Sequence, residues 1–352
     1  MRILFDLGHP ANVHYFKYLI RYLENNGHSC VVLARDKDVT ASLLHELEIP
    51  FINKGAGGTH LLDRIEYTSH SLALIQRTIQ DVNPHLCISH GSPYLAFASW
   101  RHNLPHIMFN DTEKAIFFKQ VTKWFRPDTY VPECFYETGI EGLNKLPSYM
   151  ELAYLHEDLF TPKPFVLKEL GDEYILLRFV SQHALHDIGL SQTSYHFKKS
   201  IVERLQPYGN VWISSEIPLP DDLRKFRLPV PPGEVHSVIA GARLVIGNSA
   251  TMCAEAAVLG TPSIHIHQNQ WGYIRELEER YGLLRHFDGT EHGYDLAVKA
   301  AVDMLEDVHL LNSLHNRRKR MLSEKENMFT LMARITEEKI ASLEQDEDGG
   351  GG

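Results

Sequence analysis

Residues 246–262 read IGNSATMCAEAAVLGTP, and this segment is the most informative part of the sequence. A short apolar strand runs into a turn of small residues, and the turn opens a helix that ends before Gly260. The backbone amides of Ser249, Ala250 and Thr251 lie at the start of that helix, where unpaired N–H groups and the helix dipole favour a diphosphate. The sequence therefore predicts a strand–turn–helix unit that binds phosphate groups.

Two polar side chains accompany the predicted anion site. Asn248 lies in the turn, and Glu255 lies about one and a half helical turns further on, within reach of a ribose diol. The small residues between them allow a ligand to approach the backbone closely. The alternative is an ordinary strand-to-helix turn, in which Ser249 only caps the helix and Glu255 faces the solvent.

Apolar runs and amphipathic stretches alternate along the chain on both sides of this unit. Strands are predicted at residues 2–7, 30–34, 51–52, 85–90, 106–109, 174–177, 211–213, 244–246 and 263–266. Most of these strands are separated by stretches with apolar residues at helical spacing. Such alternation with short connections favours parallel sheets covered by helices on both faces.

The length of the chain and one break in the pattern predict two domains. A chain of 352 residues exceeds the size at which a single hydrophobic core usually stops growing. Pro147, Pro162 and Pro164 interrupt the alternation, as a connector would. The expected division is an N-terminal Rossmann-like domain over 1–150, a linker over 151–165, a C-terminal Rossmann-like domain with the last helix over 166–344, and a disordered tail over 345–352.

The composition narrows the class of protein. A net charge of −10 disfavours general nucleic-acid binding, and no apolar run approaches the roughly 18 residues that cross a bilayer. The opening residues predict a strand rather than a signal segment. Cys30, Cys87, Cys134 and Cys253 form no CxxC pair, which predicts buried reduced thiols in a cytoplasmic protein. No metal is expected, since no HExxH or tight His/Cys/Asp cluster occurs.

Polar residues also follow predicted strands of the N-terminal half. The first loop carries His9 and His14 after the first strand, where open parallel sheets place their ligands. Asp111 and Glu113 follow the strand 106–109, and two carboxylates there suggest acid/base chemistry, with Asp111 as the first candidate base. The alternatives are histidines that make only local hydrogen bonds, and an Asp111 that caps a helix beginning at Thr112.

His90 and Ser92 follow another predicted strand and belong to the same expected edge. In the C-terminal half, Arg178 ends a strand and is a candidate phosphate ligand, with an inter-domain salt bridge as the alternative. His183, His186 and Asp187 in the adjoining loop are weaker candidates.

Two charged motifs are less informative. Residues 36–38 have a DxD form, which can hold a metal ion, but they follow the second predicted strand, far from the predicted anion site. The basic run 317–320 lies on a charged helix, where it is either a solvated face or a contact with anionic membrane lipid.

The stretch 246–262 resembles the corresponding segment of GT-B glycosyltransferases and of non-hydrolysing UDP-N-acetylglucosamine 2-epimerases. Those families have a Ser/Gly-rich turn, a helical Glu followed by Ala, and a closing Gly-x-Pro, which correspond to Ser249, Glu255, Gly260 and Pro262. The resemblance implies two Rossmann-like domains that face a central cleft, with residues 249–251 on the diphosphate and Glu255 on the ribose of a UDP-sugar. Where those families have one or two glycines, this chain has Ala250 and Thr251.

Over most of its length the chain also resembles a prokaryotic family of the same superfamily, domain of unknown function 354. The segments that carry this resemblance are residues 8–16, 110–113 and 178–181 and the helix of Glu255. This family indicates the fold more firmly than the reaction, so the expected activity comes from the superfamily.

The resemblance implies a glycosyltransferase that uses a UDP-sugar or similar donor without metal or tightly bound cofactor. The C-terminal domain would hold the donor, and the N-terminal domain a glycan or lipid-linked acceptor, at the inner face of the membrane if it touches the bilayer. A nucleotide-sugar 2-epimerase is the second hypothesis, although the epimerases' Glu-Ala-Gly stretch is replaced here by residues 110–113. A non-catalytic nucleotide-binding protein is the third.

Overall fold

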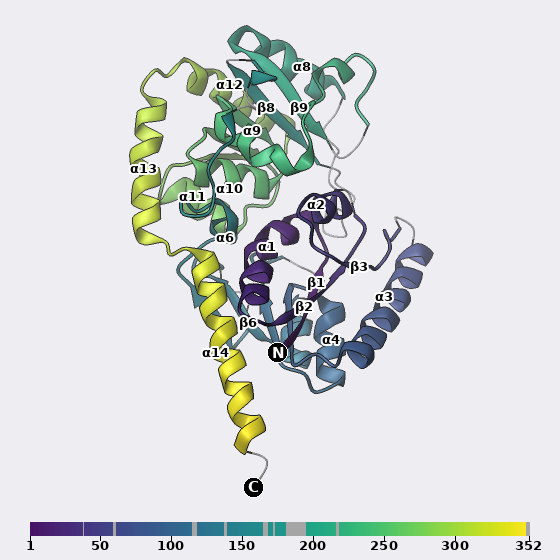
Figure 1. Cartoon of the computed structure of the whole chain (residues 1–352). Helices are drawn as coiled ribbons and strands as arrows, with labels where there is room; N and C mark the ends of the chain where they lie inside the picture. The colour runs from purple at the N-terminus through teal and green to yellow at the C-terminus, as the bar shows by residue number, and fades with distance from the viewer. Residues whose placement is uncertain are drawn as a thin grey trace. The chain divides into compact units, whose positions relative to one another are not determined.

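The chain forms two compact units of α/β structure in a computed structural model (Figure 1). Unit 1 comprises Met1–Tyr154 and Glu326–Gly352, and unit 2 comprises Leu155–Lys325. The structure describes residues 1–37, 39–58, 61–114, 118–136, 139–164, 168–171, 173–180, 195–215 and 218–349.

Unit 1 is built on a parallel sheet of seven strands in the order β3-β2-β1-β4-β5-β6-β7. The central strands are buried runs of mainly apolar residues, as expected for a parallel sheet covered on both faces. Because all strands are parallel, the residues that follow β1, β4 and β5 lie at one edge of the sheet. The strands are β1 (Arg2–Leu7), β2 (Ser29–Ala34), β3 (Ile52–Asn53), β4 (Leu86–His90), β5 (His106–Phe109), β6 (Asp128–Pro132) and β7 (Leu143–Leu146).

Helices connect these strands and bury their apolar stripes on the sheet. The first helix begins as its sequence predicts: the side chain of His9 accepts a hydrogen bond from the amide of Ala11, and Pro10 occupies the first helical position. The helices of unit 1 are α1 (Pro10–Asn25), α2 (Thr40–Glu46), α3 (Leu61–Val82), α4 (Pro93–Arg101), α5 (Phe118–Phe125) and α14 (Met328–Gly349), with the short α6 (Leu152–Leu155) where the chain leaves the unit.

The last helix, α14, belongs to unit 1, whereas the sequence assigned it to the C-terminal domain. It packs against α1, where the ring of Phe329 contacts Tyr18 and Tyr22 edge-on, and Lys339 pairs with Asp128 at 2.8 Å. Helical periodicity shows that a helix has an apolar face, but it does not show which sheet that face covers. The helix also runs to Gly349, into the stretch expected to be a tail.

Unit 2 contains a parallel sheet of five strands in the order β12-β11-β10-β8-β9. The strands are β8 (Tyr174–Phe179), β9 (Asn210–Ser215), β10 (Leu244–Gly247), β11 (Ser263–Ile266) and β12 (Arg285–Phe287). The helices are α8 (Tyr195–Leu205), α9 (Val235–Gly241), α10 (Ala250–Leu259), α11 (Gly272–Glu279), α12 (Glu291–Glu306) and α13 (Leu310–Glu324), with short 3-10 turns at Gln206–Tyr208, Arg224–Phe226 and Pro232–Glu234.

Alternate residues of β8 supply two hydrophobic cores, one on each face of the sheet. Ile175 and Leu177 join residues of α8 and α12, and Tyr174 and Leu176 join residues of α9 and α10. This alternation follows from the period of two along a strand. The expected class of two doubly wound parallel-sheet domains is therefore confirmed.

Gly247 is required by the close approach of two strands. It pairs with Arg178 across β10 and β8, and a Cβ at this position would lie 2.2 Å from the carbonyl oxygen of Arg178. Only glycine lets the backbone run this close at the point where β10 passes into the turn before α10.

All four cysteines are free thiols. Cys87 and Cys253 are buried as predicted, while Cys30 and Cys134 are only partly buried. Burial raises the pKa of Cys30 and Cys87 to about 12. Among the residues that the structure describes, no helix combines the length and apolar character that a membrane span needs.

Candidate functional site

The turn between β10 and α10 exposes a helix start at the carboxyl end of the sheet in unit 2. Ser249 is the N-cap, and its hydroxyl accepts a hydrogen bond from the amide of Met252 at 3.4 Å. Ser249, Ala250 and Thr251 are partly exposed, while residues 252–258 are buried. Since the first amides of a helix have no intrahelical acceptor, this start can receive an anion at the two positions after the cap.

Asn248, predicted as a ligand-binding residue, is bonded to the main chain of the neighbouring strand. Its Oδ1 accepts from the amide of Val180 at 2.8 Å, and its Nδ2 donates to the carbonyl of Val180 at 3.3 Å. Asn248 as a whole is 5% exposed. Asn248 therefore ties the end of β8 to the turn before α10 and positions the helix start.

Glu255 lies in the interior of unit 2, so the alternative that it faces the solvent is wrong. It is 5% exposed, and its Oε1 lies 3.0 Å from Nε2 of His236 on α9. The ring of Phe160 covers His236 edge-on at 6.1 Å between centroids. Sequence reasoning missed His236, because nothing in its spacing from Glu255 indicates that α9 and α10 turn these side chains toward each other.

Arg178 is partly exposed near the end of β8. Its Nη1 donates to the hydroxyl of Ser214 at 3.0 Å, across the pair of β8 and β9 within unit 2. This contact holds the guanidinium at the carboxyl edge of the sheet, where it remains a candidate for an anionic ligand. The weaker candidates at 183, 186 and 187 lie outside the described residues.

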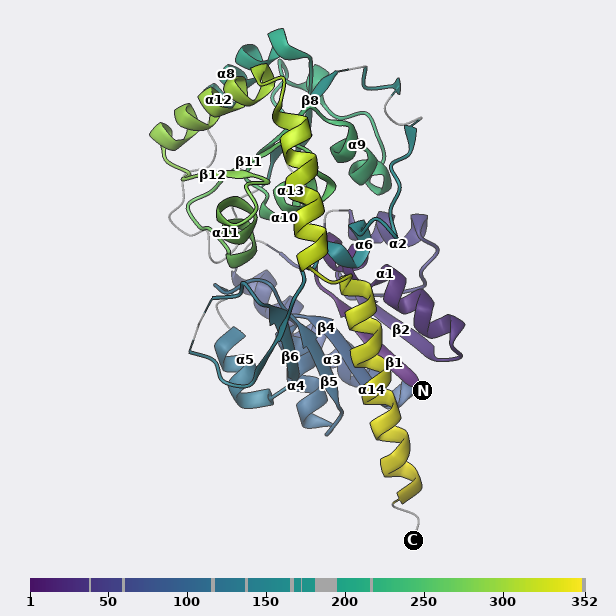
Figure 2. The same cartoon turned by 90° about the vertical axis from the view of Figure 1, so that its left-hand side faces the viewer.

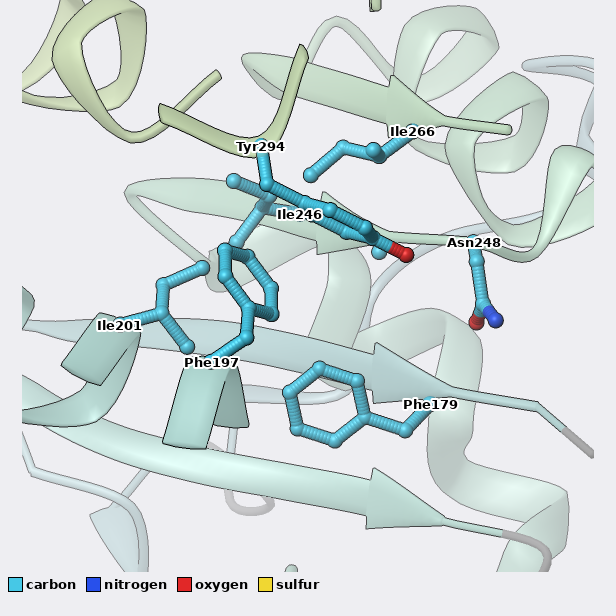
Figure 3. Close-up of a pocket in the computed structure, with 8 residues that line it drawn as sticks. Phe179, Phe197, Ile201, Ile246, Asn248, Ile266 and Tyr294 are labelled. Atoms are coloured by element: carbon cyan, nitrogen blue, oxygen red, sulfur yellow. The ribbon is translucent and has the colours of Figure 1, made fainter. Parts of the chain in front are cut away.

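A narrow pocket opens beside the same strand ends (Figure 3). The hydroxyl end of Tyr294 points toward Asn248, and the rings of Tyr294 and Phe197 lie 4.1 Å apart between centroids. The lining is almost wholly apolar and comes from β8, β10, β11, α8 and α12: Phe179, Phe197, Ile201, Ile246, Gly247, Asn248, Ile266 and Tyr294.

In unit 1 the structure gathers polar groups around Asp111. Oδ2 accepts a hydrogen bond from the hydroxyl of Tyr15 at 3.3 Å, and Oδ1 accepts from the hydroxyl of Thr112 at 3.0 Å. Oδ1 also lies 3.2 Å from Nε2 of His90. Burial raises the pKa of Asp111, but the nearby imidazole of His90 and the hydrogen bonds lower it more, so the net pKa is below that of an ordinary aspartate.

The imidazole of His90 is the more accessible partner in this pair. Its side chain is 12% exposed and that of Asp111 is 7% exposed. The ring of Tyr15 packs against the imidazole at 5.0 Å between centroids. A buried carboxylate beside one ring nitrogen of a histidine orients the imidazole ring.

The other predicted residues of unit 1 take different positions. His14 is buried and stacks on Tyr154 at 5.4 Å between centroids, while His9 is exposed and caps α1. Glu113 is buried at 7% exposure. Residues 111–114 are not helical and α5 begins at Phe118, so the alternative that Asp111 caps a helix starting at Thr112 is wrong.

A buried ion pair of Lys54 and Asp6 lies at the carboxyl ends of β1 and β3, and sequence reasoning missed it. Both side chains are 1% exposed, and the hydroxyl of Ser92 donates to the second oxygen of Asp6 at 2.5 Å. Ser92 also caps α4 through the amide of Leu95. The pair joins β1, the end of β3 and the start of α4, so it fixes the edge on which His90 lies.

The basic run 317–320 is mostly engaged in internal bonds. Arg318 donates to the carbonyl of Val258 near the end of α10 at 2.7 Å, and Arg317 to the carbonyl of Gly282 at 2.7 Å. Arg320 bonds to Glu324 at 2.9 Å.

In the DxD segment, the side chain of Asp36 accepts a hydrogen bond from the side chain of Asn53 at 3.2 Å, and residue 38 lies outside the described part. No group of three or more His, Cys, Asp or Glu that could hold a metal ion occurs among the described residues.

Known structures with a similar fold are glycosyltransferases and UDP-N-acetylglucosamine 2-epimerases. The MnaA protein of S. aureus with UDP has a TM-score of 0.66 at 14% identity, over 93% of this chain and 92% of that one. The spinosyn rhamnosyltransferase SpnG with thymidine diphosphate has a TM-score of 0.63 at 12% identity, over 96% and 100%. The UDP-GlcNAc 2-epimerase of Methanocaldococcus jannaschii with UDP-GlcNAc and UDP has a TM-score of 0.61 at 17% identity, over 87% and 93%.

These similarities define the class: a protein of the GT-B fold. Residues 1–338 match the family described as "Protein of unknown function (DUF354)", and the chain belongs to this family. Comparison with curated protein sequences gives no match.

Proposed function

We propose that the protein is a glycosyltransferase that moves a sugar from a nucleotide-sugar, with a UDP-sugar as first candidate, to a glycan or lipid-linked acceptor without metal. The observation that carries the proposal is the pair of His90 and Asp111 at the carboxyl edge of the sheet in unit 1. A partly exposed imidazole backed by a buried carboxylate is a suitable general base for an acceptor hydroxyl.

His90 rather than Asp111 is the proposed base. Asp111 accepts contacts from three groups and its pKa is lowered, so it is a weak base that acts as a positioning residue. In the proposed step, the acceptor hydroxyl gives its proton to His90 while its oxygen bonds to the anomeric carbon. The bond from that carbon to the diphosphate breaks, and its electron pair leaves with the nucleoside diphosphate.

The helix start at Ser249 supports the donor side of the proposal. The dipole of α10 and the amides of its first turn would stabilise the charge that the leaving diphosphate gains. Arg178, on the neighbouring strand, is the proposed cation for the same phosphates. Contact of Glu255 with the ribose stays a prediction, and it would depend on His236 as well, because the two side chains share a hydrogen bond.

A panel of nucleotide-sugars tests donor binding. A bound donor should raise the melting temperature of the full chain by mass action, whereas sugars without nucleotide should not. Release of nucleoside diphosphate from the donor that binds then reports turnover. If no nucleotide-sugar stabilises the chain at millimolar concentration, the proposal is wrong.

His90→Gln tests the base. Turnover should fall by roughly two to four orders of magnitude, the usual contribution of a general base, while the affinity for the nucleotide stays unchanged. His315→Gln is the matched control, because this exposed histidine lies on α13 in unit 2. Equal loss of turnover in both variants, or full activity of His90→Gln, would remove the assignment.

A nucleotide-sugar 2-epimerase is the second candidate, because solved structures of similar fold include such epimerases. NMR of a candidate UDP-sugar incubated with the protein in the absence of acceptor separates the two reactions. Appearance of the 2-epimer favours the epimerase. A third possibility, a non-catalytic nucleotide-binding protein, predicts that Asp111→Asn leaves every measurable function intact.

A further inference from the structure

Two tryptophans are exposed on neighbouring helices of unit 1. Trp100 on α4 is 54% exposed and Trp124 on α5 is 63% exposed, and the two helices pack against each other (Figure 2). Phe97 and Phe125 extend the surface: Phe97 lies 6.2 Å from Trp100 and 5.7 Å from Phe125, and Trp100 lies 5.6 Å from Phe125, between ring centroids. We call these four residues the aromatic patch. Apolar side chains gathered on a surface in this way mark an interaction site.

Exposed cations accompany the aromatic patch. Arg101 lies on α4, Lys119 and Lys123 lie on α5, and Arg126 follows α5 directly. Residues 93–105 and 118–127 contain no Asp or Glu, although the whole chain carries a net charge of −10. None of the four cations has an ion-pair partner within the part of the chain that the structure describes, in contrast to Arg318 and Arg320 of the run 317–320.

The chemistry of this surface selects its partner. Tryptophan prefers the boundary between hydrocarbon and water, because its ring is apolar and its N–H is polar. Lysine and arginine are attracted to anionic headgroups, while the acidic remainder of the chain is repelled from them. The combination fits a protein that lies on a bilayer rather than one that spans it.

We propose that α4 and α5 dock the protein on the surface of an anionic phospholipid bilayer, with Trp100 and Trp124 in the headgroup region and the four cations against the lipid phosphates. This surface differs from the run 317–320, whose arginines are engaged in internal bonds. The proposal does not depend on sugar transfer, since it concerns binding to lipid alone.

Vesicle binding by the full chain is the direct test. The protein should co-sediment with vesicles of phosphatidylglycerol and phosphatidylcholine at low salt, should bind pure phosphatidylcholine far less, and should detach as salt screens the cations. Two of the four tryptophans of the chain lie in the patch. Insertion should therefore shift the tryptophan emission to the blue, and this shift should be lost in Trp100→Ser/Trp124→Ser.

Charge reversal at the patch distinguishes docking through α4 and α5 from an effect of the net charge of the whole protein. Lys119→Glu/Lys123→Glu should weaken partitioning at least roughly tenfold, because each cation near an anionic surface adds attraction. The control Lys299→Glu/Lys319→Glu changes the net charge equally at exposed positions of unit 2 and should bind as the wild type does. All four positions are exposed, and melting curves confirm that each variant folds.

Three results would overturn the proposal. The first is no binding of the wild type to anionic vesicles at low salt. The second is equal loss of binding in the patch variant and the control. The third is dimerisation through the aromatic patch without any binding to vesicles. Size-exclusion chromatography would then show a wild-type dimer that Trp100→Ser/Trp124→Ser converts to a monomer.

Discussion

Glu255 and His236 form a buried polar pair, so a substitution of Glu255 changes the stability of unit 2 whether or not Glu255 contacts a ligand. Their hydrogen bond of 3.0 Å lies in the interior of unit 2, where both side chains are at most 7% exposed. Removal of one partner from such a pair leaves the other polar group buried without its acceptor or donor. A loss of nucleotide binding in a Glu255 variant is therefore open to two explanations unless stability is measured too.

Glu255→Ala should lower the free energy of unfolding by about 1–3 kcal/mol, because His236 loses its buried acceptor. Glu255→Gln keeps an oxygen for His236 and should lose less. If Glu255 also contacts the ribose, both variants should weaken UDP binding in calorimetry at a temperature where both are folded. Unchanged affinity in Glu255→Gln would leave Glu255 with a structural role alone.

Among the elements of unit 2, the packing of β8 against β10 and the start of α10 depends on two neighbouring residues. Gly247 lets the strands approach, and Asn248 bonds to both main-chain groups of Val180. These contacts set the direction in which α10 leaves the sheet. They therefore also set the direction in which the N–H groups of its first turn point. Gly247 and Asn248 therefore determine the position of the helix start.

Gly247→Ala should destabilise unit 2 by on the order of 3 kcal/mol, because the added Cβ meets the backbone of β8, which cannot move aside as a flexible side chain would. Gly142→Ala is the comparison: its φ is 77° but an added Cβ meets nothing within 4 Å, so its cost should be nearer 1 kcal/mol. Thermal unfolding of both variants measures the difference, and equal costs would contradict the role given to strand approach.

Local patterns were enough to predict nine of the twelve described strands, because a period of two or 3.6 residues is visible in any short window; β6, β7 and β12 were not predicted. Local patterns did not predict the contacts between segments that are distant in the sequence. The hydroxyl of Tyr15 reaches Asp111 across 96 positions of the chain, and Lys54 reaches Asp6 across 48. Asp111 could be singled out because it follows a strand, but its low pKa and its dependence on His90 and Tyr15 appear only when the sheet is assembled.

In the molecule as a whole, each unit contains a buried or half-buried histidine whose pKa is lowered. Burial lowers the pKa of His106 in unit 1 to about 3. Burial, together with the charge of His267, lowers that of His286 in unit 2 to about 4. In the unfolded chain each would titrate near 6.5. Below that pH the unfolded chain binds protons that the folded chain does not, so stability that is complete above pH 6.5 is lost progressively as the pH falls toward the folded values.

The melting temperature of the full chain should therefore fall between pH 7 and pH 5. His106 alone contributes a loss of about 2 kcal/mol at pH 5, at about 1.4 kcal/mol for each pH unit below its ordinary pKa. His106→Gln can keep a hydrogen bond with Ser89 or Ser99, and it should flatten the pH dependence of unit 1. An unaltered slope in this variant would show that other groups govern the acid response.

Unit 1 contains segments from both ends of the polypeptide. The chain forms all of unit 2 before it returns to unit 1, where α14 packs against α1. A ribosome therefore releases every residue of unit 2 before it delivers the helix that covers Tyr18 and Tyr22. The N-terminal part of unit 1 is synthesised first, but the surface of α1 is covered only when α14 has been synthesised. A fragment that stops at Tyr154 would carry an uncovered aromatic face into solution, and chaperone capture during synthesis would concentrate on that face.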